Sequence, residues 1–99
     1  MSVMMLRSRV RPECVAGLEA SVGRVFAALA RICPAGVRYA SSRLGDGVTY
    51  LVLLEIEDGV ENPLPAIPEF REFQEGLRGW VAEPPETERM TVVGSYRLF

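Results

Sequence analysis

The segment Val48–Glu57 constrains the fold more than any other part of this 99-residue chain. Its alternating residues predict a β-strand, and the middle of that strand is apolar on both faces. One face carries Tyr50 and Val52. The other carries Leu51 and Leu53. Because one layer of helices covers only one face of a small sheet, the second face needs another cover. The simplest cover is the same sheet of a second copy, so this strand predicts a homodimer through the sheet face.

Apolar periodicity along the rest of the chain predicts six elements in the order βαββαβ. The expected elements are strands at Val3–Val10, Val37–Leu44, Val48–Glu57 and Glu88–Phe99, and helices that begin at Pro12 and Pro68. Proline is favoured at the first position of a helix, and Gly45-Asp46-Gly47 is typical of a hairpin turn. This order predicts one α+β domain over residues 1–99. Its class is ferredoxin-like, with a four-stranded antiparallel sheet that carries both helices on one face.

The composition excludes several kinds of chemistry. The chain has no histidine, and all eleven of its cationic residues are arginine. Triads that need histidine, histidine metal sites and lysine Schiff bases are therefore excluded. The net charge of −2 has interspersed signs, which disfavours nucleic acid as a partner.

The longest strongly apolar run, Val48–Leu54, is too short to cross a bilayer, and Arg7 interrupts the first apolar stretch. We therefore expect a cytoplasmic protein that contacts no membrane.

The two cysteines fall at opposite ends of the first predicted helix. Cys14 and Cys33 are nineteen positions apart in the sequence. At a rise of about 1.5 Å per residue they would lie about 28 Å apart, which no disulfide spans. The sequence therefore predicts two free thiols.

Several stretches together carry a resemblance to a known family. They are the alternating residues 3–9, the strand pair at 37–43 and 50–55, the Phe70-x-x-Phe73-x-x-x-Leu77 helix and the final stretch 92–96. Over nearly its whole length the chain resembles the dimeric α/β-barrel superfamily, in particular the small antibiotic-biosynthesis-monooxygenase-like proteins. The resemblance implies a homodimer with facing sheets and, in each subunit, a pocket between sheet and helices. Catalytic members oxidise polycyclic phenols with O₂ and use neither metal nor flavin, so the resemblance implies that this chain uses no metal and no other cofactor.

Two residues are candidates for catalysis. Glu55 is the one acid flanked by long apolar runs, and burial would raise its pKa and suit it to act as a general base. Trp80 continues the apolar stripe of the second helix after Phe73 and Leu77, which fits either core packing or a pocket wall.

Four residues are candidates for substrate binding: Arg9, Tyr50, Phe73 and Asn62. Arg7 and Arg9 share a strand face and would suit an anionic or phenolate ligand, although ion pairs with Glu55 or Glu57 would also explain them. The Tyr50 hydroxyl could reach a cavity or bond to the backbone. Asn62 could hold a ligand or help its loop to turn.

These observations lead to one functional hypothesis and one alternative. The hypothesis is a cofactor-independent monooxygenase-like homodimer that acts on or binds a bulky aromatic, polyketide- or quinol-like, small molecule. In the polyketide-oxidising members an asparagine is followed four residues later by tryptophan, whereas Asn62 is followed at that distance by Ala66. The alternative is therefore a non-catalytic dimeric module that binds a ligand or another protein.

Overall fold

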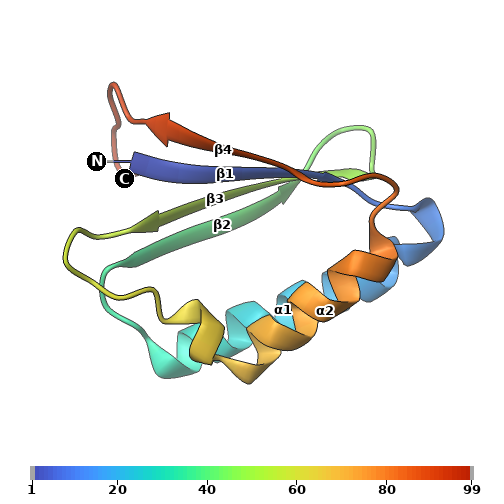
Figure 1. Cartoon of the computed structure of the whole chain (residues 1–99), viewed down its shortest axis with the longest axis horizontal. Coiled ribbons are helices and arrows are strands. Elements are labelled where there is room, and N and C mark those ends of the chain that lie inside the picture. Colours follow the sequence, from blue (N-terminus) through green and yellow to red (C-terminus); the bar gives the residue numbers. More distant parts are fainter. Residues whose placement is uncertain (1, 99) are drawn as a thin grey trace.

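A computed structural model describes residues 2–98 as a four-stranded antiparallel sheet with two helices on one face (Figure 1). The strands are β1 (Ser2–Arg9), β2 (Val37–Arg43), β3 (Thr49–Ile56) and β4 (Glu86–Thr91), and the helices are α1 (Val15–Ile32) and α2 (Pro68–Trp80). A short 3₁₀ helix precedes each α-helix, η1 at Pro12–Cys14 and η2 at Leu64–Ala66. The strand order β2-β3-β1-β4 confirms the predicted ferredoxin-like βαββαβ fold.

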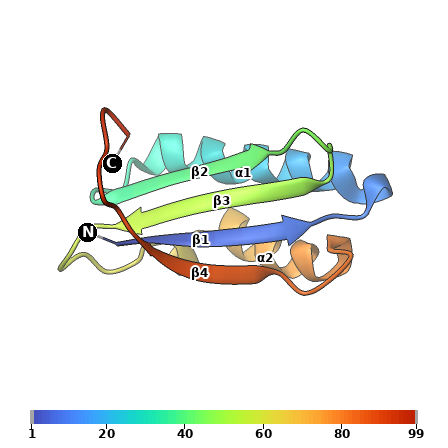
Figure 2. The same ribbon diagram turned by 90° about the horizontal axis from the view of Figure 1, so that it is seen from above.

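The two faces of the sheet have different neighbours. Val52 and Leu54 of β3 face the helices, because they line the same cavity as Phe73 of α2. Alternation along the strand then places Leu51 and Leu53 on the opposite side, here called the open face. Figure 2 looks onto the open face, with both helices behind the sheet. Leu51 and Leu53 are half-buried in the single chain, so the expectation that this strand is apolar on both faces is confirmed.

The core lies between the helices and the sheet. Its main cluster of buried side chains consists of Val10, Leu18, Val25, Tyr50 and Phe73, and a smaller one of Ala28, Leu64 and Ile67. From α1, Leu18 and Val25 belong to the main cluster, seven residues and hence two turns apart on one face of the helix, and Ala28 belongs to the smaller cluster. Leu64 of η2 is fully buried and closes the end of this core.

The turn between β2 and β3 is held by Asp46. The backbone N–H groups of Val48 and Thr49 donate to its Oδ1, at 3.0 and 2.8 Å, and the Thr49 hydroxyl donates to its Oδ2 at 2.5 Å. Chiefly the Thr49 hydroxyl, then these two N–H groups and the nearby Arg9 charge, lower the pKa of Asp46 to about 2. Gly47 has a φ of +79°, a conformation that favours glycine. The predicted hairpin is confirmed.

The last strand is shorter than the sequence predicts. β4 ends at Thr91, so the expected strand Glu88–Phe99 is wrong over residues 92–98, and Phe99 lies outside the described residues. β4 is an edge strand that pairs with β1, and the register places Thr91 opposite Ser2, where β1 begins. The segment 92–98 leaves the sheet beyond that point and runs past its end on the side away from the helices (Figures 1 and 2).

The cysteines lie as the sequence predicts. Cys14 precedes α1 and Cys33 follows it, and both are free thiols. Within residues 2–98, neither helix is long and apolar enough to cross a membrane.

Candidate functional site

A mainly apolar cavity lies between α2 and the helix-facing side of the sheet, with a volume of about 210 Å³. It is lined by Met4, Leu6, Tyr39, Val52, Leu54, Phe70, Phe73, Gln74, Leu77 and Thr87. Met4, Gln74 and Thr87 are exposed and mark its mouth, whereas Val52 and Phe73 are buried inside it. A largely apolar concave site with a few polar groups is the usual form of a small-molecule pocket.

Local patterns in the sequence place these side chains. Residues two apart on a strand share a face, which brings Met4 and Leu6 of β1 beside Leu54 and Val52 of β3, their register partners. On α2 the spacing Phe70, Phe73, Leu77 puts three apolar side chains on the face that meets the sheet.

Tyr39 of β2 supplies a phenol to the cavity wall. Its ring stacks on Phe26 of α1 with centroids 5.1 Å apart, and it meets Phe70 edge-on at 6.4 Å. Burial raises the pKa of Tyr39 to about 12, so its hydroxyl is neutral at physiological pH. The other polar groups in the lining belong to Gln74 and Thr87, and no lining residue is charged. The cavity therefore offers hydrogen-bond donors but no carboxylate or imidazole that could accept a proton.

Tyr50, a predicted substrate-binding residue, is engaged elsewhere in the core. Its hydroxyl donates to Oε2 of Glu19 on α1 at 2.5 Å, and Arg43 donates to the same oxygen at 2.7 Å. The hydrogen bond from Tyr50, followed by the charge of Arg43, lowers the pKa of Glu19. Burial and then Glu19 raise the pKa of Tyr50. These contacts join α1 to the edge of the sheet, and Tyr50 does not line the cavity.

The two predicted aromatic site residues of α2 point to different places. Phe73 lines the cavity. Trp80 instead lies over Gly76 of its own helix and close to Gly17 of α1, and it is not among the lining residues. Trp80 also packs against the main core cluster. Its position therefore agrees with the core-packing interpretation and not with that of a pocket wall.

Glu55, the other predicted catalytic residue, lies on the open face and not with Trp80. It is 7% exposed, and its Oε1 lies 3.7 Å from Nε of Arg38 on β2. Among residues 2–98, its buried Oε2 has no hydrogen-bond partner. Within that same range neither Arg7 nor Arg9 forms an ion pair, so the expected pairing with Glu55 or Glu57 is wrong. The structure thus separates Glu55 and Trp80, and their catalytic roles stay predictions.

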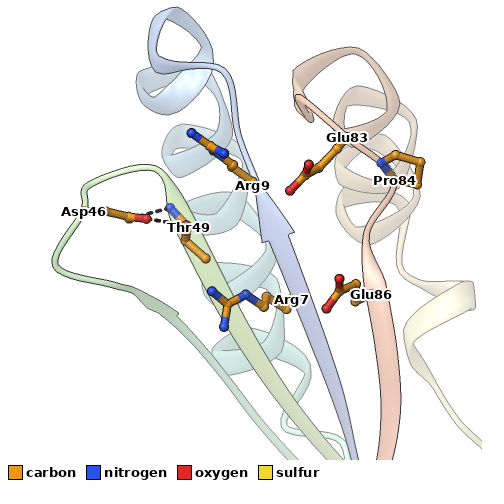
Figure 3. Close-up of a pocket in the computed structure, with 7 residues that line it drawn as sticks. All are labelled: Arg7, Arg9, Asp46, Thr49, Glu83, Pro84 and Glu86. Carbon is orange, nitrogen blue, oxygen red and sulfur yellow. Dashed lines mark hydrogen bonds between the residues drawn. The ribbon is translucent and has the colours of Figure 1, made fainter.

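A polar cleft of about 320 Å³ occupies one end of the open face. It is lined by Arg7, Arg9, Asp46, Thr49, Glu83, Pro84 and Glu86 (Figure 3). In Figure 3 the two guanidinium groups extend toward β3, while Glu83 and Glu86 lie on the β4 side. Arg9, predicted to bind substrate, therefore belongs to a mixed-charge surface on the far side of the sheet from the aromatic cavity.

Asn62, the remaining predicted binding residue, has a local role. Its side-chain oxygen accepts a hydrogen bond from the backbone N–H of Leu64 at 3.0 Å. This contact shapes the loop that leads into η2 and agrees with the turn-forming interpretation.

Sequence comparison gives no relative: no protein-family profile and no curated protein matches the chain. Solved structures do match. An oxygenase described as cofactor-independent, SnoaB from Streptomyces nogalater, superposes with a TM-score of 0.68 at 20% identity, over 97% of this chain and 96% of that one. This chain has the antibiotic biosynthesis monooxygenase fold.

Two further structures support that conclusion. A protein of Nitrosomonas europaea assigned to the antibiotic biosynthesis monooxygenases matches with a TM-score of 0.76 at 12% identity, over 95% of this chain and all of that one. One of Caulobacter crescentus with the same assignment gives 0.70 at 18%, over 94% and 90%. At these identities the likeness establishes the fold and leaves the activity to be argued from this chain's own residues.

Sequence reasoning found part of the cavity. Phe73 was identified as a binding residue, but Gln74 and Thr87 were not, because single polar residues at a strand or helix surface carry no periodic signal. Tyr39 lies in the predicted strand 37–44, where its hydroxyl, like that of Tyr50, could be expected either to reach a cavity or to bond to the backbone. No group of three or more His, Cys, Asp or Glu side chains that could hold a metal occurs among residues 2–98.

Proposed function

We propose that this chain is a cofactor-independent, monooxygenase-like protein that binds an aromatic small molecule in the cavity between α2 and the sheet. The observation that carries the proposal is the lining itself. Phe70, Phe73 and Tyr39 provide ring surfaces, and the uncharged hydroxyl of Tyr39 provides a hydrogen bond. The likeness to a cofactor-independent oxygenase fold supports the same interpretation.

The chemistry that suits such a cavity uses electrons from the substrate. A methylene group between two aromatic rings, once deprotonated, can be oxidised by O₂ to a ketone with release of one water, which balances without a cofactor. The apolar walls would keep bulk water from the anion, and Tyr39 would donate a hydrogen bond to its oxygen. Because the lining holds no carboxylate or imidazole, the substrate must be acidic enough to lose its proton to solvent.

The same absence of a proton acceptor in the lining favours the alternative, a module that binds an aromatic ligand without converting it. The two candidates share a site and differ only in turnover.

Anthrone, a three-ring ketone with such a methylene group, separates these candidates. We expect oxygen uptake in a 1:1 ratio to product, and loss of both binding and uptake in Leu54→Phe, which fills the cavity. Ala27→Phe is the matched control, since it adds the same ring on an exposed residue of α1. Binding without uptake would select the non-catalytic module. The proposal fails if neither anthrone nor the smaller 2-naphthol binds, or if Leu54→Phe and Ala27→Phe behave alike.

We further propose that a second copy of the chain covers the open face. Arg7 and Arg9 share its polar cleft with Glu83 and Glu86, yet neither arginine forms an ion pair within residues 2–98. A cleft that presents charges of both signs and closes no ion pair with its own arginines can be complementary to a second copy of itself across a twofold axis. The half-buried Leu51 and Leu53 lie on this face, and the exposed Val93, Tyr96 and Leu98 follow β4 at its end.

Analytical ultracentrifugation tests this assembly. At micromolar concentration we expect a dimer of about twice the 10.9 kDa chain mass. Leu53→Asp should shift the equilibrium to single chains by placing an unpaired charge in the interface. Ala27→Asp, on the exposed side of α1, should leave the dimer intact. A monomeric wild-type protein at 100-fold higher concentration would contradict the proposal.

A further inference from the structure

A second groove lies on the other side of Tyr39. It has a volume of about 330 Å³ and runs between the last turns of α1 and the edge strand β2. Its lining residues are Phe26, Leu29, Ala30, Cys33, Pro34, Val37 and Tyr39. In the described part of the chain, Tyr39 is the one residue that lines both this groove and the cavity beside α2.

Tyr39 is held in place by packing alone, against two aromatic rings and the main core cluster. It stacks on Phe26 at 5.1 Å and touches Phe70 edge-on at 6.4 Å. Its hydroxyl forms no hydrogen bond with any residue in 2–98, and burial is the one cause of its raised pKa. No polar anchor would have to break for the ring to turn about its side-chain torsions.

The volumes show why that movement matters. A cavity of about 150 Å³ takes a single benzene ring, and sites for larger small molecules span about 300–1,000 Å³. The cavity beside α2, at about 210 Å³, is therefore too small to enclose three fused rings, while cavity and groove together fall within the larger range.

We infer that Tyr39 is a movable wall, and that its displacement joins cavity and groove into one site for an uncharged, planar ligand of three or more fused rings. This inference rests on the proposed function and adds its size class. Neither lining contains a charged residue, which fits a ligand that is apolar over most of its surface. Smaller ligands, with one or two rings, fit the cavity while Tyr39 stays in place.

The test compares 2-naphthol, with two rings, and anthrone, with three, by isothermal titration calorimetry. Tyr39→Ala removes the Tyr39 ring and hydroxyl from the cavity wall for both probes, but it removes the need to move the ring for anthrone alone. The ratio of anthrone affinity to 2-naphthol affinity should therefore rise at least 10-fold over the wild-type ratio. Tyr39→Phe keeps the ring and drops the hydroxyl, so it should retain the wild-type preference for the smaller probe.

A kinetic measurement on the wild-type protein covers the case in which Tyr39→Ala does not fold. The observed rate of anthrone binding should level off at high concentration, since ring displacement then limits it, while that of 2-naphthol should rise linearly. Equal anthrone-to-naphthol affinity ratios in wild type and Tyr39→Ala, or linear kinetics for both probes, would overturn the inference and leave the proposed function standing. Failure of the wild type to bind either probe would overturn both.

Discussion

Replacing Gly76 by alanine should destabilise the protein, because Trp80 folds back over that residue. An alanine Cβ would lie 2.7 Å from Cζ2 and 2.8 Å from Cζ3 of the indole, so the ring or the helix would have to shift. Overpacking of this kind costs about 1–3 kcal/mol. Gly79→Ala on the same helix is the matched control, because a Cβ there meets nothing within 4 Å. Both substitutions gain up to about 1 kcal/mol of helix propensity.

The free energies of unfolding of the two variants should therefore differ by about 1–3 kcal/mol, with Gly79→Ala the more stable. Urea titration followed by circular dichroism measures that difference, which for a domain of this size corresponds to roughly 4 °C or more in Tm. Agreement within about 0.5 kcal/mol would refute the reasoning. The indole would then not pack against Gly76, and Trp80 would be free to line the cavity as the sequence alone allowed.

Two further predictions follow from the pKa values of Tyr39 and Asp46. Because the pKa of Tyr39 is raised from 10.0 to about 12 in the folded state, the unfolded chain ionises first and stability should fall between pH 10 and 12. The ionisation of Tyr39 should lower the free energy of unfolding by up to about 2–3 kcal/mol over this range. In alkaline urea titrations, Tyr39→Phe should abolish this part of the loss. Because the pKa of Asp46 is lowered to about 2, its stabilising effect should be present above pH 4 and lost as the pH falls toward 2. Asp46→Asn should be less stable than wild type at pH 7, and acid titrations should show that gap closing near pH 2; a gap independent of pH would contradict the assignment.

The order of the elements was predictable because it depends on local periodicity and turn chemistry. Each of the patterns that predicted the elements spans only a few residues, so it can be recognised without the rest of the chain. These patterns are the alternation in β3, the apolar spacing in α1 and the Gly45-Asp46-Gly47 turn. The two apolar faces of β3 were predictable for the same reason.

The site was less predictable because it depends on which elements meet. Trp80 shares the helical stripe of Phe73, but at the last turn of α2 its ring finds the space beside Gly17. Glu55 is buried, as its apolar neighbours suggested, yet strand alternation puts it on the face away from the cavity. The length of β4 is likewise set by where its partner β1 begins, which the β4 sequence does not encode.

The alternation of β3 also provides the most direct test of the proposed site. Methyl NMR of the protein titrated with 2-naphthol reports on neighbouring residues that face opposite sides of one strand. Val52 and Leu54 line the cavity, whereas Leu51 and Leu53 lie on the open face. We expect saturable shifts at Val52 and Leu54 with little change at Leu51 and Leu53. Shifts confined to Leu51 and Leu53, or none at any of the four, would contradict a ligand site between α2 and the sheet.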